Sequence, residues 1–274
     1  MKEAEATIRL VALDIDDTLL APDLTIPGPS AAAVRAVLAQ GTPVVLATGR
    51  MFRSALPYAL ELGVTLPLIS YNGALVRDPA GETLAHQPVP LDLAHSVIRL
   101  CAQEDLTLNL YLDDDLFVAR RTPEVAHYEE IAGLPAQEVG DLAGFLARRG
   151  GEPTKLLIVA APEKAEELAA RLGELHRGVL NVMRSRPRFV EIVREGVDKW
   201  WAVLAIAERL GVAPGEIMAM GDSRNDLLML ERAALSVTVP HAPGYLKAAA
   251  DYVTEKDDGL GVAEALERFV LSRR

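Results

Sequence analysis

Apolar and polar positions follow two distinct patterns along this chain. In its N-terminal and C-terminal parts, continuous apolar runs such as IRLVAL (8–13) are followed by segments with helical periodicity, such as PSAAAVRAVLAQG (29–41). A continuous apolar run is typical of a strand buried on both faces, and strands separated by helices pair in parallel through right-handed crossovers. We therefore predict an α/β fold whose core is a Rossmann-like, doubly wound parallel sheet. Its strands are expected at 8–13, 42–47, 66–70, 188–193, 216–220 and 235–240.

The middle of the chain has the second pattern. TLNLYLDDDLFVAR (107–120) alternates apolar and polar residues on either side of three aspartates, as in an antiparallel hairpin. LDLAHSVIRLCAQED (91–105) has the periodicity of an amphipathic helix. We predict an inserted α+β cap domain at 86–187, which leaves 1–85 and 188–274 as the core.

Composition and charge exclude several classes of partner. The chain has 274 residues, of which half are hydrophobic, so it is long enough for a sizeable core. Its 39 acidic side chains outnumber 28 basic ones, giving a net charge of −11, which argues against nucleic acid or an anionic membrane as a partner.

The single cysteine, Cys101, excludes an intramolecular disulfide and is expected to be a buried apolar side chain. With no signal-peptide pattern and no membrane-length apolar run, we expect a cytoplasmic protein.

Polar residues gather where predicted strands end, which is where doubly wound sheets bind ligands. The first strand ends in Asp14, Asp16 and Asp17. Asp14 and Asp16 point the same way if the segment is extended, and Mg²⁺ would neutralise two adjacent carboxylates. A carboxylate beside Mg²⁺ can attack phosphorus while its neighbour transfers a proton. Taken alone, the aspartates are equally explained by a solvated turn with helix-capping side chains.

Three further features occupy equivalent places. Thr48, Gly49 and Arg50 offer a hydroxyl and backbone N–H groups to a phosphate, although an ordinary N-cap explains them too. Lys199 begins a predicted helix, where its positive charge is unfavourable because the N-terminal end of the helix dipole is also positive. Either a nearby anion or a solvated ion pair with an acidic side chain would offset this unfavourable interaction. The turn GDSRND (221–226) carries two acids and an asparagine, which favour a metal or phosphate site over a plain capped turn. Together and in this order, the four features predict one site.

The four motifs resemble those of the haloacid dehalogenase (HAD) superfamily of phosphohydrolases. The insert between the second and third motifs is similar to the type IIB cap of the Cof-like branch, as are YNGA (71–74) and FVEIV (189–193). The resemblance covers nearly the whole chain. The motifs are DIDDTLL (14–20), ATGR (47–50), GVDK (196–199) and GDSRND (221–226).

The resemblance implies a role for each matching residue. Asp14 would be the nucleophile that becomes an aspartyl phosphate, and Asp16 the general acid and then base. Thr48 and Lys199 would hold the transferred phosphoryl group. Mg²⁺ would be bound by the carboxylates of Asp14 and Asp222 and the main-chain carbonyl of Asp16, with Asp226 supporting the metal shell. The residues expected near the phosphate or the domain hinge are Gly49, Arg50, Asn72, Gly73 and Asn225.

Two positions depart from the family pattern, and other functions remain open. Asp17 replaces a usual glycine, and VPHAP (239–243) replaces a usual Gly-Asn-Ala turn, so that His241 is expected to be a surface turn residue.

A phosphomutase of the same fold, a receiver-like regulatory domain and a non-catalytic phosphate-binding protein are alternatives. The first expectation is a Mg²⁺-dependent hydrolase of small phosphorylated metabolites, with sugar phosphates the first guess, acting as a monomer or homodimer. Cap residues that could contact the leaving group, each better explained as core or solvated, are Tyr111, His127, Tyr128, Lys155, Arg184 and Arg186.

Overall fold

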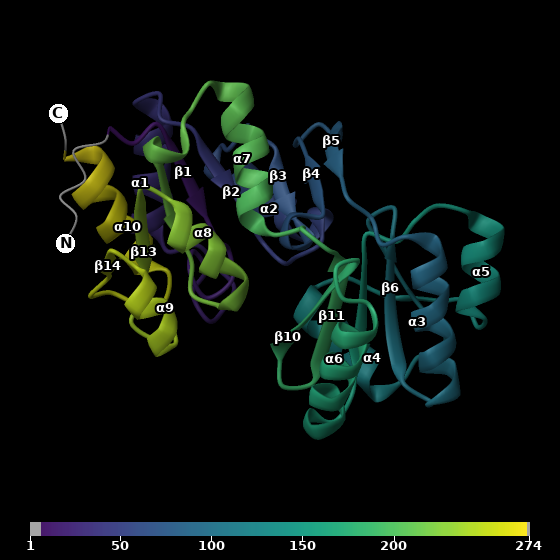
Figure 1. Cartoon of the computed structure of the whole chain (residues 1–274). Helices are drawn as coiled ribbons and strands as arrows, with labels where there is room; N and C mark the ends of the chain where they lie inside the picture. Colours follow the sequence, from purple (N-terminus) through teal and green to yellow (C-terminus); the bar gives the residue numbers. More distant parts are fainter. Residues whose placement is uncertain (1–6, 273–274) are drawn as a thin grey trace. The chain divides into compact units, whose positions relative to one another are not determined.

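The computed structural model describes residues 7–272 and divides the chain into two compact units (Figure 1). The first unit joins Met1–Leu84 to Asp198–Arg274, and the second is Ala85–Val197. The sequence placed the second boundary near 187, but the inserted unit continues to Val197. The reason is that strand β11 (Phe189–Arg194) pairs with two strands of the inserted unit and not with the core sheet.

The first unit is built on a five-stranded sheet in the order β14-β13-β12-β1-β2, with every neighbouring pair parallel. In the register of the central strands, Leu13 lies beside both Leu46 and Met220. Strands β1, β2, β12 and β13 are buried at every position. The continuous apolar sequences of β1, β2 and β12 predict this burial, whereas β13 also buries the polar residues Ser236 and Thr238. The strands are β1 (Leu10–Leu13), β2 (Val44–Leu46), β12 (Ile217–Met220), β13 (Leu235–Thr238) and β14 (Tyr252–Val253).

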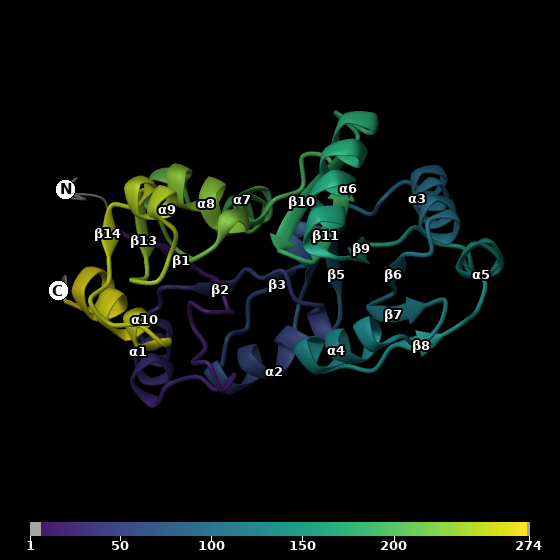
Figure 2. The same cartoon turned by 90° about the horizontal axis from the view of Figure 1, so that it is seen from below.

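Helices cover both faces of this sheet, which confirms the doubly wound prediction. Figure 2 shows α7, α8 and α9 along one side of the strands and α1, α2 and α10 along the other. The helices are α1 (Gly28–Ala39), α2 (Phe52–Leu62), α7 (Lys199–Leu210), α8 (Leu227–Arg232), α9 (Gly244–Ala249) and α10 (Leu260–Leu266), the last continued by a π-helical turn at Glu267–Leu271. Short 3-10 turns lie at Tyr71–Gly73, Pro214–Glu216 and Arg224–Asp226.

The predicted third strand differs from expectation. It forms β3 (Leu68–Ser70), which touches the core sheet through a parallel bridge between Ala47 and Ile69. On its other side it pairs in antiparallel fashion with β4 (Leu75–Arg77), which neighbours β5 (Thr83–His86). This small sheet leads the chain out of the first unit.

The inserted unit is an α+β domain with the sheet order β10-β11-β9-β6-β7-β8. All its strand pairs are antiparallel except β7 with β8. Its apolar core includes Leu110, Ile158 and Cys101, the free thiol being 2 % exposed. The strands are β6 (Thr107–Leu112), β7 (Asp115–Val118), β8 (Gln137–Glu138), β9 (Lys155–Val159), β10 (Leu180–Arg186) and β11. The helices are α3 (Leu91–Gln103), α4 (Pro123–Ala132), α5 (Leu142–Arg149) and α6 (Pro162–Leu175).

Several candidate leaving-group residues of the inserted unit have partners inside it. Lys155 is buried, with its Nζ 3.3 Å from Oε2 of Glu191 and 4.8 Å from the centre of the Tyr111 ring. Tyr128 lies edge-on to Tyr111. His127 is exposed. Their part in substrate binding stays a prediction.

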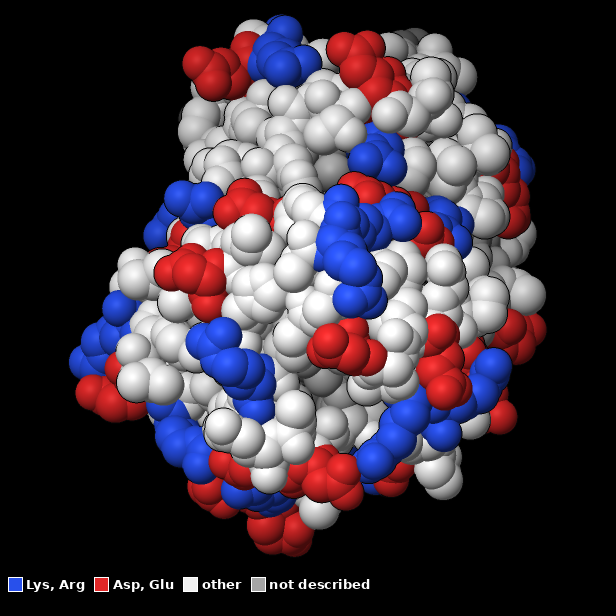
Figure 3. Space-filling view, turned by 90° about the vertical axis from the view of Figure 1, so that its right-hand side faces the viewer, with Lys and Arg blue, Asp and Glu red and all other residues white. Residues whose placement is uncertain are grey.

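Charges of both signs are interspersed on the face shown in Figure 3. This face therefore lacks the uniformly basic surface typical of proteins that bind nucleic acid. No helix within residues 7–272 combines the length and the apolar composition that crossing a membrane requires.

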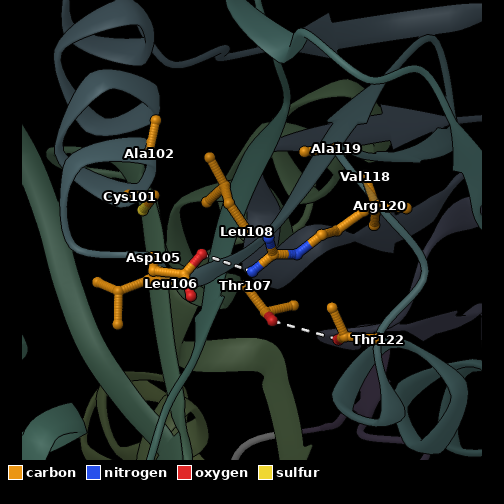
Figure 4. Close-up of a pocket in the computed structure, with 10 residues that line it drawn as sticks. All are labelled: Cys101, Ala102, Asp105, Leu106, Thr107, Leu108, Val118, Ala119, Arg120 and Thr122. Atoms are coloured by element: carbon orange, nitrogen blue, oxygen red, sulfur yellow. Dashed lines mark hydrogen bonds and ion pairs between the residues drawn. The ribbon is translucent and has the colours of Figure 1, made fainter.

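The inserted unit also contains a pocket of about 230 Å³ between the end of α3 and strands β6 and β7. Figure 4 shows Arg120 reaching Asp105 across it, with 2.5 Å between Nη2 and Oδ1, and Thr107 meeting Thr122. None of the predicted site residues lines this pocket.

Candidate active site

Strand register brings the ends of three predicted motifs to one edge of the core sheet. The amide of Asp14 donates to the carbonyl of Met220 at 3.0 Å, and the amide of Ala47 donates to the carbonyl of Leu13 at 2.8 Å. Asp14, Thr48 and Asp222 therefore lie within two residues of the ends of three neighbouring parallel strands. The carboxyl ends of parallel strands are the usual place for a ligand in such a fold.

Four charged side chains meet at this edge in a buried cluster. Nζ of Lys199 donates to Oδ1 of Asp14 and, at 2.7 Å, to Oδ1 of Asp226. Asp14, Asp222 and Asp226 each place a carboxylate oxygen within 4.8 Å of the others. The exposed fractions are 3 % for Asp14, 8 % for Asp222 and 0 % for Asp226 and Lys199. The alternative of a solvated lysine at the start of α7 is therefore wrong.

The electrostatics of this cluster favour an added cation. Burial, and next the charge of Asp226, raises the pKa of Asp14 well above its ordinary value, despite the opposing effect of Lys199. Burial and Asp226 also raise the pKa of Asp222 to about 6. Burial works to lower the pKa of Lys199, but Asp14 and Asp226 raise it above its ordinary value. Three carboxylates face one ammonium, so a divalent cation would balance the charge of the ionised cluster.

Asp226 connects the lysine to the turn that carries Asp222. Its Oδ2 accepts backbone N–H groups from Asp222 at 3.1 Å and Ser223 at 3.0 Å, while Oδ1 accepts from Lys199. A side chain at Gly221 would collide with the Asp226 carboxylate. The glycine therefore allows the carboxylate to lie against the backbone.

A cap fixes the start of α7. The side chain of Asp198 accepts the backbone N–H of Trp201 at 2.7 Å, which makes Lys199 the first helical residue. Gly73, with φ of +102°, packs so closely that an added Cβ would collide with the carbonyl oxygen of Asp198. The predicted turn residue Gly73 thus lies beside the helix start that carries Lys199.

The other predicted phosphate-side residues also come together. Oγ1 of Thr48 is fully buried and accepts the backbone N–H of Arg50 at 3.1 Å. Asn225 donates through Nδ2 to Oδ1 of Asn72 at 2.8 Å. A Cβ at Gly49 would lie 2.9 Å from that same Oδ1. The second motif, the turn after β3 and the last motif are therefore in direct contact.

Asp16 lies near the carboxylate cluster, since its charge, after burial, Asp226 and Asp222, also raises the pKa of Asp14. Its side chain is not a member of the buried acidic group found among the described residues, and Arg50 holds it through Nε and Nη2. Burial opposes the charge of Arg50, but its hydrogen bonds to Asp16 raise the pKa of Arg50. This contact was not expected from the sequence, which predicted Arg50 near the phosphate or the domain hinge.

Three more residues surround Asp222. Oγ1 of Thr18 donates to Oδ1 of Asp222 at 3.1 Å, a contact that the sequence analysis missed although Thr18 belongs to the first motif. His241 lies in an exposed turn, with Nδ1 2.5 Å from Asp257 and Nε2 3.8 Å from Asp222. Asp17 has φ of +55°, the left-handed conformation for which glycine is usual and aspartate is tolerated.

The donor set suits a hard divalent cation. Mg²⁺ prefers carboxylate and carbonyl oxygens, and Asp14 and Asp222 offer carboxylates from neighbouring strands. Cysteine and histidine are absent from the group, so softer metals are less well matched. The residues of this edge therefore fit Mg²⁺.

Residues 11–266 match the family model described as haloacid dehalogenase-like hydrolase. The chain belongs to this family. As a member it is an α/β hydrolase of the HAD superfamily, of the phosphatase type.

Curated relatives and a solved structure support the assignment along the whole chain. The chain is 29 % identical over 273 residues to 5-amino-6-(5-phospho-D-ribitylamino)uracil phosphatase YitU of Bacillus subtilis, covering 95 % of this chain and 97 % of the relative. It is 27 % identical over 242 residues to HMP-PP phosphatase of Serratia proteamaculans, covering 87 % and 86 %. The crystal structure of TM0651 from Thermotoga maritima matches with a TM-score of 0.85 and 31 % identity, covering 96 % and 97 %.

Proposed function

We propose that this HAD phosphatase hydrolyses monoesters of small phosphorylated metabolites by transferring the phosphoryl group to Asp14. The observation that carries the proposal is the buried ion pair of Asp14 with Lys199 at the carboxyl edge of the sheet. A buried carboxylate next to an ammonium and two further acids has the composition that phosphoryl transfer requires, namely an anionic nucleophile among charge-compensating groups.

Mg²⁺ is the proposed cofactor, held by the carboxylates of Asp14 and Asp222 and the main-chain carbonyl of Asp16. Asp226 would orient the site through the backbone of Asp222 and through Lys199. When bound, the ion supplies positive charge that keeps Asp14 ionised and offsets the charge of the phosphate. Lys199, which stays protonated beside its two acids, supplies the second compensating charge.

The proposed reaction has two steps, in which Asp14 forms and then loses a bond to phosphorus and Asp16 transfers the proton. In the first step an oxygen of Asp14 bonds to phosphorus, the ester P–O bond breaks, and Asp16 gives its proton to the leaving alcohol. In the second step Asp16 takes a proton from water, whose oxygen bonds to phosphorus as the bond to Asp14 breaks. The hydroxyl of Thr48 and the ammonium of Lys199 would bind the phosphoryl oxygens.

Sugar and polyol phosphates are the substrates that we propose first. The name of the relative YitU describes a phosphate on a ribityl chain, which is a polyol monoester. HMP-PP phosphatase has a different substrate at a similar identity, so this chain should be tested against both kinds of phosphate.

A phosphate-release screen tests the proposal. Wild-type protein, Asp14→Asn and the exposed control Asp92→Asn are incubated with sugar, polyol and pyrimidine phosphates, each with Mg²⁺ and with EDTA. Wild type and Asp92→Asn should release inorganic phosphate only with Mg²⁺, and acid quenching should trap a phosphorylated Asp14 detectable by mass spectrometry. Turnover by Asp14→Asn would overturn the nucleophile assignment, and transfer to a second sugar without phosphate release would favour the phosphomutase.

A further inference from the structure

Arg50 binds the side chain of Asp16 as a two-pronged fork. Its Nε lies 3.0 Å from Oδ1 and 2.9 Å from Oδ2, and its Nη2 lies 2.6 Å from Oδ1. A planar guanidinium that touches both oxygens fixes the direction of a carboxylate, which a single ammonium cannot do.

Arg50 is itself held in place from several directions. Nη1 donates to Oγ of Ser54 at 3.4 Å, and the guanidinium carbon lies 5.2 Å from the centre of the Tyr58 ring. Ser54 and Tyr58 lie four residues apart on one face of α2, and Arg50 lies just before this helix, which begins at Phe52. The backbone of Arg50 is also fixed, because its N–H donates to Thr48 and its carbonyl accepts from Tyr71.

The exposed fractions of the two side chains indicate that Arg50 holds Asp16 in place, and not the reverse. The side chain of Arg50 is 12 % exposed and that of Asp16 is 37 % exposed. The arginine thus forms the braced and covered partner, while the aspartate is the more accessible one. A general acid needs this combination of access to substrate and a fixed orientation.

We propose that Arg50 is a positioning residue that orients the carboxyl group of Asp16 for both proton transfers. The proposal rests on the function proposed above. Oδ1 accepts from both nitrogens and Oδ2 from Nε alone, so Oδ2 is the oxygen that exchanges the proton with the leaving alcohol and then with water. Arg50 keeps its own protons throughout. This role replaces the phosphate contact that the sequence motif indicated.

The dependence of rate on the leaving group separates the two roles. Proton donation matters for a poor leaving group such as glycerol and little for p-nitrophenolate, whereas a phosphate contact matters equally for both. We would measure the single-turnover rate of ester cleavage with glycerol 2-phosphate, phenyl phosphate and p-nitrophenyl phosphate. The variants are Arg50→Gln, Arg50→Lys, Asp16→Asn and Arg50→Gln with Asp16→Asn.

We expect Arg50→Gln to lower the rate of ester cleavage mainly for the substrate with the poor leaving group. Arg50→Gln should slow cleavage of glycerol 2-phosphate on the order of 10²-fold, the cost of a misplaced catalytic group, with far less effect on p-nitrophenyl phosphate and little change in KM. Arg50→Lys should restore only part of the rate, because it lacks the fork. The double variant should be no slower than Asp16→Asn, because the arginine acts through the aspartate.

Controls keep loss of folding and loss of function apart. Arg35→Gln removes an exposed arginine of the same unit that bonds the Glu61 carbonyl, and it should leave all rates unchanged. Tyr58→Leu removes the brace but not the fork and should reproduce the selective loss in weaker form. Circular dichroism and thermal unfolding establish that each variant is folded.

Two outcomes would overturn the assignment. An equal loss on all three esters with a raised KM and weaker inhibition by inorganic phosphate would make Arg50 a phosphate ligand. Unchanged rates in folded Arg50→Gln would remove it from the reaction. In both cases active wild type and inactive Asp14→Asn would leave the proposed function standing, whereas an Asp14→Asn variant that cleaves these esters would overturn that function itself.

Discussion

Lys199 and Asp226 form an ion pair that is wholly enclosed by protein, with 2.7 Å between Nζ and Oδ1 and neither side chain exposed. The other oxygen of Asp226 accepts two backbone N–H groups of the turn that begins at Gly221. The lysine also contacts Asp14 at the end of β1. One ammonium therefore links the first, third and fourth motifs, and its charge should stabilise the fold as well as the reaction.

Removing this charge should destabilise the protein. Lys199→Met keeps most of the volume but leaves Asp14 and Asp226 buried without a cation, so we expect a loss of about 3–5 kcal/mol in the free energy of unfolding at neutral pH in EDTA. Urea unfolding followed by circular dichroism measures it. Lys256→Met, at an exposed position, is the matched control and should change stability by less than about 0.5 kcal/mol. Equal stability of the two variants would show that Lys199 does not offset the acids.

Mg²⁺ should stabilise the folded protein through the same acids. Binding to the native state alone adds about 2.7 kcal/mol at a hundredfold excess over Kd, so the thermal midpoint should rise with Mg²⁺ concentration. Asp222→Asn removes one carboxylate from the cluster and should abolish most of this rise. Asp92→Asn should retain the wild-type response, because Asp92 lies on an exposed turn of α3. A midpoint of the wild type that is independent of Mg²⁺ would contradict the cation site.

The contact between Gly73 and Asp198 gives a test of backbone crowding. Gly73 and Gly81 have nearly the same positive φ, +102° and +98°, so alanine is strained at both. Only at Gly73 would the added Cβ strike a carbonyl oxygen, that of Asp198, whereas nothing lies within 4 Å of it at Gly81. We expect Gly73→Ala to cost about 1–3 kcal/mol more than Gly81→Ala in urea unfolding, and to lower kcat because Lys199 follows Asp198 directly. Equal effects at the two glycines would mean that the helix start yields to the methyl group.

The sequence could predict where the site lies because strand ends have a fixed geometry. Asp14, Thr48 and Asp222 follow continuous apolar runs, and parallel strands bring such ends to one edge. The pairing of Asp16 with Arg50 could not be predicted, because a long side chain can reach several partners and spacing in sequence does not choose among them. The burial of Lys199 also depends on tertiary packing, although its place at a helix start suggested an acidic neighbour.

Helix α4 of the inserted unit escaped prediction for a physical reason. α4 buries only Val125 and Tyr128, so its apolar periodicity is weak. Its end signals were present, with Thr122 accepting the N–H of Val125 and Gly133 in the left-handed conformation at the C-terminus.

The boundary near 187 was misplaced because β11 has the apolar pattern of a core strand but pairs within the inserted unit.

Cys101 should make stability fall with rising pH. Burial, and next the charge of Glu104, raises the pKa of its thiol to about 12 from an ordinary value of 9.0. A raised pKa means that the folded chain keeps a proton which the unfolded chain loses, so this contribution is complete below pH 9 and is lost as pH rises toward 12. Relative to Cys101→Ala, the wild type should lose about 1.4 kcal/mol for each pH unit above 9.

The measurement is urea unfolding of both proteins at pH 8 and pH 10. Subtracting the free energy of unfolding of Cys101→Ala from that of the wild type removes the contribution of all other titrating groups, because the two chains differ only at this side chain. Iodoacetamide provides a second readout, since it reacts with thiolate. At pH 8 it should label native Cys101 far more slowly than the urea-unfolded chain, because the folded state holds the thiol protonated and 2 % exposed. A stability gap that stays constant between pH 8 and pH 10, with rapid labelling of the native protein, would show that the thiol ionises freely within the fold.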